Sequence, residues 1–120
     1  QFIGTPKMNI LKITDKDFLS NNEVKFLGNN IKFNEISLSE KNYYFGIRPE
    51  HFTISSDCEY KFKPKIDLTE NLGNEKIAYI KIDNHEISAK VPTQSNTIDQ
   101  IGFNTKSIFV FDENGKRVRS

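Results

Sequence analysis

The chain has 120 residues, of which 36% are hydrophobic and 28% charged; this is typical of one folded domain and excludes a disordered chain. Seventeen basic residues against 16 acidic ones leave a net charge of +1, which removes the electrostatic case for a dedicated nucleic-acid or anionic-membrane binder. The single cysteine, Cys58, excludes an intrachain disulfide and favours a reducing compartment.

The predicted elements are short strands. Ten phenylalanines and four tyrosines against two alanines favour strands over helices. The main predicted strands cover residues 8–13, 23–27, 31–33, 42–47, 60–69, 77–83, 86–91 and 107–111. Roughly eight strands at spacings of about 8–12 residues predict a small all-β barrel or sandwich.

Turn residues separate these strands and give finer predictions. A Gly-Asn-Asn turn at 28–30 predicts a hairpin, and Pro49 should end the strand before it because proline has no backbone donor. Alternation of apolar and polar residues over 60–69 predicts one half-buried strand, with an edge or a bulge at Pro64. One helical turn is expected within 97–102.

No catalytic or metal-binding pattern stands out. The sequence has neither G-x-x-x-x-G-K-[ST] nor G-x-G-x-x-G, so this chain alone should not hydrolyse a nucleotide. His51, Cys58 and His85 lack the local ligand pairs that are usual in zinc sites, so solvated polar roles are the better interpretation. A nucleophile pair of Cys58 and His51 is disfavoured because Asp57 and Glu59 flank the thiol.

Residues 60–65 interleave aromatic rings with lysines, a composition that single-strand nucleic-acid binders use. Alternation along a strand, however, places Tyr60 and Phe62 on one face and the lysines on the other. The rings then belong to the core and the lysines to solvent.

Arg48, Pro49, Glu50 and His51 directly follow an apolar strand. Pro49 restricts the backbone, and Arg48 and Glu50 could pair with each other or with a partner surface. From these residues alone, a strand-ending turn with a local ion pair is the simpler interpretation.

Four segments of the chain resemble motifs of carbohydrate-type ABC importer ATPases, in the same order. They are residues 2–9 (FIGTPKMN), 46–52 (GIRPEHF), 70–75 (ENLGNE) and 111–117 (FDENGKR). The resemblance is to the C-terminal regulatory domain in the maltose and glycerol-3-phosphate importer ATPase family. It implies an all-β fold, a small OB-like (transport-associated OB, TOBE) barrel of short antiparallel strands with at most one or two helical turns.

The resemblance also implies a domain organisation and roles for the motif residues. Residues 1–9 would be the junction to a missing N-terminal ATPase domain, and 10–120 a single regulatory domain. Gly4, Pro6, Met8 and Asn9 would mark the junction. Arg48, Pro49, Glu50 and His51 would lie at a domain or subunit contact, and Leu72, Gly73 and Glu75 would shape the turn that enters a hairpin.

The function implied is that of a non-catalytic regulatory and dimerisation domain, which supports ATP-driven uptake of a sugar or a sugar-phosphate-like solute. Its partners would be its own ATPase domain, a second copy, the transmembrane permease subunits and, in some importers, a regulatory protein, but no nucleic acid. It would lie in the cytoplasm, at the inner face of the membrane. The chain would bind no cofactor, and ATP and Mg²⁺ would belong to the missing ATPase domain. The alternative is a free-standing OB-like barrel that binds single-stranded nucleic acid or a small ligand.

Overall fold

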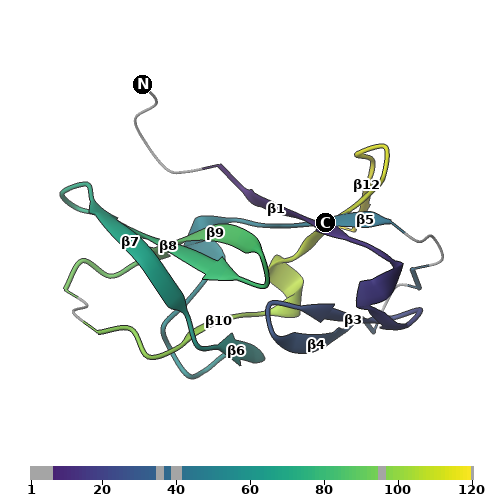
Figure 1. Cartoon of the computed structure of the whole chain (residues 1–120), viewed down its shortest axis with the longest axis horizontal. Coiled ribbons are helices and arrows are strands. Elements are labelled where there is room, and N and C mark those ends of the chain that lie inside the picture. Colours follow the sequence, from purple (N-terminus) through teal and green to yellow (C-terminus); the bar gives the residue numbers. More distant parts are fainter. Residues whose placement is uncertain (1–6, 35–36, 39–41, 95–96, 120) are drawn as a thin grey trace.

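The computed structural model describes residues 7–34, 37–38, 42–94 and 97–119, and these are nearly all strand or turn (Figure 1). The twelve strands are β1 (Asn9–Ile13), β2 (Phe18–Ser20), β3 (Glu23–Phe26), β4 (Asn29–Lys32), β5 (Tyr43–Ile47), β6 (Tyr60–Phe62), β7 (Lys65–Asn71), β8 (Lys76–Ile82), β9 (His85–Val91), β10 (Ile101–Phe103), β11 (Phe109–Asp112) and β12 (Arg117–Arg119). Three single turns of 3₁₀ helix join them: η1 (Asp15–Asp17), η2 (Pro49–His51) and η3 (Thr105–Ser107). The predicted all-β fold is confirmed, and no described helix has the length and apolar character needed to cross a bilayer.

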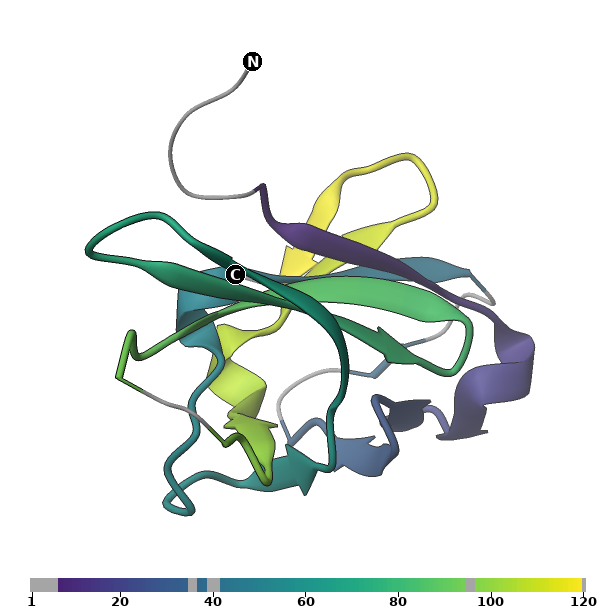
Figure 2. The same ribbon diagram turned by 60° about the vertical axis from the view of Figure 1, so that its left-hand side comes forward.

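The strands form four small antiparallel sheets. Their orders are β1-β5-β11-β12, β2-β3-β4, β7-β8-β9 and β10-β6. The β1-β5-β11-β12 sheet lies on one side of the molecule, the sheets that contain β3 and β6 lie on the opposite side, and β7-β8-β9 lies beside them (Figures 1 and 2). This arrangement of short strands in compact sheets is consistent with a small OB-like domain.

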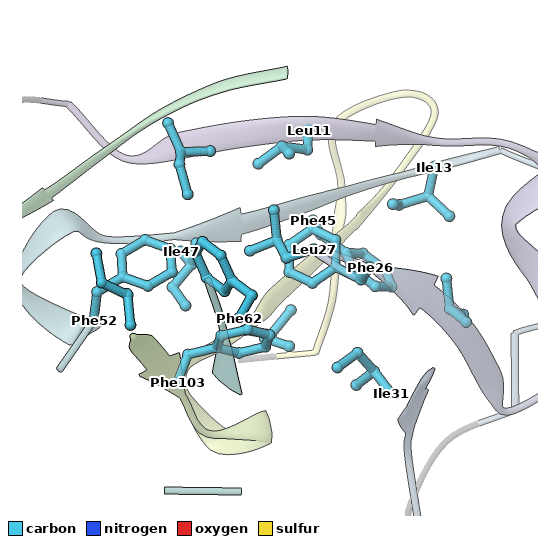
Figure 3. Packing of buried hydrophobic residues seen from close by; sticks show 14 of the residues in the cluster. Leu11, Ile13, Phe26, Leu27, Ile31, Phe45, Ile47, Phe52, Phe62 and Phe103 are labelled. Atoms are coloured by element: carbon cyan, nitrogen blue, oxygen red, sulfur yellow. The ribbon is translucent and has the colours of Figure 1, made fainter. Parts of the chain in front are cut away.

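The four sheets share one hydrophobic core. Phe45 of β5 is fully buried and makes edge-to-face ring contacts with Phe26 at 5.2 Å and Phe33 at 5.5 Å between centroids. Phe26 in turn contacts Phe103 of β10 at 5.8 Å, so the rings bridge opposite sides of the molecule (Figure 3). Each such buried ring stabilises the fold by about 1.5–3 kcal/mol.

Two tight turns depend on backbone in the left-handed region. Leu27 (φ 50°) and Gly28 (φ 77°) join β3 to β4, and Asp83 (φ 48°) and Asn84 (φ 66°) join β8 to β9. Positive φ at both central residues matches the right-handed twist of the flanking strands. The first hairpin is therefore present as predicted, but its turn lies one residue earlier than 28–30 and β4 begins at Asn29.

Three sequence predictions need correction. The single strand predicted for 60–69 is two strands, because the chain breaks at Lys63 and Pro64; β6 pairs with β10, whereas β7 pairs with β8. The helical turn predicted within 97–102 is wrong: Ile101 and Phe103 are fully buried in β10, and the nearest turn is η3. The described strands also number twelve rather than about eight, since several of them have only three or four residues.

Candidate functional site

The segment Arg48–His51 forms the turn by which the chain leaves β5. Pro49 opens η2, where its fixed φ suits the turn and its missing N–H is not needed. The His51 N–H donates to the Arg48 carbonyl at 3.0 Å, and the Phe52 N–H donates to the Pro49 carbonyl at 3.4 Å. The turn is therefore closed by its own backbone.

Buried residues anchor this turn on both sides. Ile47, Pro49 and Phe52 are buried, and η2 packs against β9. After Phe52, Thr53 exchanges two backbone hydrogen bonds with Gly102, at 2.9 and 2.8 Å. Arg48, Glu50 and His51 lie between these anchors and are exposed. The result is a rigid loop that presents three polar side chains to solvent.

Arg48 does not pair with Glu50. Its guanidinium carbon lies 5.6 Å from the centroid of the Phe109 ring on β11, and in the described part of the chain it forms no ion pair. Arg117 of β12 lies over the same ring, at 4.8 Å. The local ion pair favoured from the residues alone is therefore replaced by a cation–π contact with a strand about 60 residues away.

Asn9 holds the end of β5 in place from inside the fold. Its Nδ2 donates to the Ile47 carbonyl at 3.0 Å and to the Ser88 carbonyl at 2.9 Å. Its Oδ1 accepts from the Ser88 N–H at 2.8 Å and from the Ser88 Oγ at 3.3 Å. One buried amide thus ties β1 to β9 and to the residue before Arg48.

Leu72, Gly73 and Glu75 lie in the turn between β7 and β8. Gly73 has φ +89°, and the Leu72 N–H donates to the Glu75 carbonyl at 2.7 Å. The Glu75 carboxylate forms an ion pair with Lys90 of β9 at 3.3 Å. Asn74 of this turn and Glu50 of η2 line one open depression of about 480 Å³, so two of the motif segments are neighbours in space.

The predicted junction residues are only partly visible. Gly4 and Pro6 lie outside the described residues. Met8 precedes β1, and Asn9 is the first residue of that strand. The Met8 side chain lies over β5, because a Cβ placed on Gly46 would come within 2.5 Å of its Sδ.

The residues weighed for a metal site, His51, Cys58 and His85, are not grouped as one site among the described residues. The described residues contain no group of three His, Cys, Asp or Glu side chains that could hold a metal ion. Cys58 lies against Gly102, and its thiol points to the Ser55 and Tyr60 carbonyls at 3.5 and 3.4 Å.

The rings of the 60–65 segment are packed inward rather than displayed. Tyr60 and Phe62 both pack against Phe103, while Lys61 and Lys63 are exposed. Both rings therefore pack into the core, as the alternation predicted.

Sequence reasoning missed the surroundings of Arg48. The sequence places Phe109 in a predicted strand, Arg117 at the end of the fourth motif, and Asn9 in a predicted strand and at the predicted junction. The alternation of Phe109, Val110 and Phe111 would have shown that the two rings share one side of the strand. No residue near Arg48 in the sequence indicates that its side chain lies over these two rings.

No protein-family model matches the chain. Curated proteins do match it. The chain is 26% identical over 130 residues to the α-glucoside transport ATP-binding protein AglK of Rhizobium meliloti, covering 100% of this chain and 36% of the relative. It is 24% identical over 127 residues to the sulfoquinovosyl glycerol transport ATP-binding protein SmoE of Agrobacterium fabrum, covering 97% and 34%.

A shorter match has higher identity. The chain is 35% identical over 89 residues to the maltose/maltodextrin import ATP-binding protein MalK of Yersinia pseudotuberculosis, covering 68% of this chain and 23% of the relative. At its widest, the match spans about a third of the length of these relatives. The chain is thus similar to one part of the ATP-binding subunits of sugar importers.

Proposed function

We propose that this chain is a non-catalytic accessory domain, of the TOBE type, in the ATP-binding subunit of an importer for a sugar or a sugar-phosphate-like solute. Its relatives are ATP-binding proteins of transport systems and are about three times as long as the matched region. The 120 residues contain no phosphate-binding motif. ATP and Mg²⁺ would therefore bind to another part of the same subunit.

The observation that carries this proposal is the Arg48–His51 loop. It is one of the four motif segments, and backbone hydrogen bonds close it while Arg48, Glu50 and His51 stay exposed. The loop assembles no nucleophile, base and orienting partner. A rigid loop with exposed polar side chains suits a contact with another domain or subunit.

The loop would face the ATPase domain of the same subunit or a second copy across a two-fold axis. Permease subunits would hold the assembly at the inner face of the membrane, with this domain in the cytoplasm. Because the linked parts are held together, the contact needs little affinity of its own.

The size of the native protein tests this assignment. An antibody raised against this chain should detect, in the source cells, a protein of about three times 13.9 kDa. Mass spectrometry of that band should find a peptide with the G-x-x-x-x-G-K-[ST] motif before residue 2. A band at 13.9 kDa would overturn the assignment and favour a free-standing barrel.

A further inference from the structure

The β1-β5-β11-β12 sheet has an outward side that no described element covers. Alternate residues of these strands point to the core, and the labelled core side chains lie on one side of β1 and β5 (Figure 3). β11 and β12 continue this sheet beyond β5, and the turn that joins them extends away from the small sheets (Figure 2). We call the residues on the outward side, together with the adjoining Arg48, the outer face: Ile10, Lys12, Tyr44, Gly46, Phe109, Phe111, Arg117 and Arg48.

The centre of the outer face is apolar and open to solvent. Ile10 is 53% exposed, and Phe109 and Phe111 stack side by side with centroids 6.4 Å apart. Gly46 makes room between them, since a Cβ there would lie 3.2 Å from both the Ile10 Cδ1 and the Phe111 Cε2. Aromatic and aliphatic groups gathered in this way around a glycine are typical of a contact surface.

Two arginines lie close together on this apolar centre. The guanidinium carbons of Arg48 and Arg117 are 5.6 and 4.8 Å from the Phe109 centroid, so they lie within about 10 Å of each other. Neither forms an ion pair with a carboxylate among the residues that the structure describes. Two like charges therefore lie at one ring without a carboxylate of the described residues within ion-pair distance.

The rest of the outer face does not compensate these two charges. Among the described residues, its outward strand positions carry Lys12 and Arg117 but no aspartate or glutamate. The nearby carboxylate of Asp112 accepts hydrogen bonds from the Asn114 and Lys116 N–H groups of its own turn. The outer face therefore combines an apolar centre with uncompensated positive charge.

We propose that the outer face docks a polypeptide surface that carries carboxylates around an apolar side chain. A carboxylate matches a guanidinium in charge and can accept two parallel hydrogen bonds from it, and the planar guanidinium can stack on Phe109 at the same time. The apolar side chain of the partner would cover Ile10 and Phe111. The proposed contact surface then includes Ile10, Phe109, Phe111 and Arg117 beside the Arg48–His51 loop.

The inference rests on the proposed contact role of Arg48, and it assigns the carboxylates to the adjoining part of the same ATP-binding subunit. Met8 supports this source, because its side chain already lies on the outer face beside Gly46. A domain that precedes Met8 in the chain would begin next to this face.

Two other occupants fit less well. Single-stranded nucleic acid needs free ring faces for base stacking, whereas Phe109 already has two guanidinium groups over it and the net charge is +1. A second copy on a two-fold axis would bring the same patch against itself, so that the cations would meet cations.

The first test uses this chain and a fluorescein-labelled synthetic peptide in which glutamates flank a central leucine. Fluorescence anisotropy at low salt should show binding of this peptide, and no binding of the matched peptide with glutamines in place of glutamates. Arg117→Gln and Arg48→Gln should each weaken binding by about tenfold, as expected for the loss of a charge-assisted hydrogen bond. Lys63→Gln, which removes an exposed cation outside this face, should change binding by less than about twofold.

Other outcomes of this test would overturn the inference. Equal binding of the glutamine peptide, or equal weakening by Lys63→Gln, would show that the two arginines do not recognise carboxylates. Tighter binding of a labelled oligothymidylate would favour nucleic acid. Concentration-dependent sedimentation that Arg117→Gln abolishes would favour a second copy. Far-UV circular dichroism of each variant shows whether the fold is retained.

A second measurement identifies the source of the carboxylates in the native protein. Zero-length carbodiimide coupling should join Lys12 to an aspartate or glutamate outside residues 1–120, but should not join Lys63 to one. Peptide binding together with a native band at 13.9 kDa would keep the chemistry of the outer face and reject the importer assignment. A long native protein without peptide binding or Lys12 coupling would reject only the inference.

Discussion

Asn9 shows how a single polar side chain can position a whole loop. Its amide is buried and uses both ends, with two donated and two accepted hydrogen bonds to Ile47 and Ser88. Burying an amide whose hydrogen bonds are all made costs little free energy of folding. Removing that amide leaves buried backbone groups without hydrogen-bond partners. The end of β5 and the start of the Arg48–His51 loop therefore depend on a residue 38 positions earlier.

Replacing Asn9 with alanine should destabilise the protein strongly. The change leaves the Ser88 N–H and the Ile47 carbonyl without the amide, and each unsatisfied buried group costs about 1–3 kcal/mol. We expect a loss of about 3 kcal/mol in the free energy of unfolding, measured by urea denaturation. Asn30→Ala, at an exposed strand position, is the control and should stay within about 0.5 kcal/mol of the original. Equal effects of the two changes would contradict the role assigned to Asn9.

Tyr79 of β8 has a perturbed acidity that the structure explains. Its hydroxyl donates to the Glu70 Oε1 at 2.9 Å. This hydrogen bond, with smaller contributions from burial and from the negative charge of Glu70, raises the pKa of Tyr79 above its ordinary value of 10.0. Because the folded state holds the phenol proton more tightly, this stabilisation is complete below pH 10.0 and is lost as the pH rises through the folded-state pKa.

The change Glu70→Gln should lower the pKa of Tyr79 toward 10.0, since it removes the charge and weakens the hydrogen bond. The ultraviolet absorbance of tyrosinate measures this titration, and Tyr79→Phe identifies which part of the curve belongs to Tyr79. Glu86→Gln, which removes an exposed carboxylate from β9, should leave the curve unchanged. If Glu70→Gln also leaves it unchanged, the hydrogen bond is not the cause.

At the scale of elements, the β8-β9 hairpin depends on the conformation of its turn. Asp83 and Asn84 both adopt positive φ, at 48° and 66°, which is unfavourable for most side chains but tolerated by aspartate and asparagine. The register of the strands follows, with Ile82 opposite His85 and Ile80 opposite Ile87. Because alternation is strict, this register buries Ile80 and Ile87 in the core.

The stability of variants at Asn84 should therefore depend on how well the new residue tolerates positive φ. Asn84→Ala should cost about 1 kcal/mol, because it places an ordinary Cβ in the left-handed region, whereas Asn84→Gly should be neutral or stabilise by up to about 1 kcal/mol. Thermal unfolding measures both. Asn74→Ala is the matched control, because in the β7-β8 turn the positive φ belongs to Gly73. A cost for Asn74→Ala as large as that for Asn84→Ala would argue against a backbone origin.

At the scale of the whole molecule, the core is continuous across the four sheets. The cluster that contains Phe45 includes buried residues from the β1 sheet, the β3 sheet, the β8 sheet and the β6-β10 pair. In the part of the chain that the structure describes, these sheets have two to four strands each, so none can bury its apolar side alone. The sheets therefore stabilise one another.

Unfolding should accordingly be a single cooperative transition. Far-UV circular dichroism, which reports on all strands, and tyrosine fluorescence should give the same midpoint in urea. Phe45→Leu should lower both midpoints together, because it removes a ring shared by Phe26 and Phe33. Two separate transitions would contradict a single core shared by the four sheets.

Local patterns predicted much of this fold and of the loop. Alternation located most strands, turn residues located the first hairpin to within one residue, and Pro49 marked the end of β5. The side chains of Arg48, Glu50 and His51 are exposed, as their polarity indicates. These features depend on residues close together in the chain, and their physics is local.

The sequence by itself thus determined that this is a small all-β domain in which Pro49 ends an apolar strand and polar residues follow. Only the tertiary structure decided that 60–69 is divided between two sheets, that Asn9 bonds Ser88 across 79 positions, and that Arg48 and Arg117 share Phe109. The reason is physical. Alternation shows which side of a strand is apolar. It does not show which other strand that strand pairs with, or which apolar side of a sheet stays exposed to solvent.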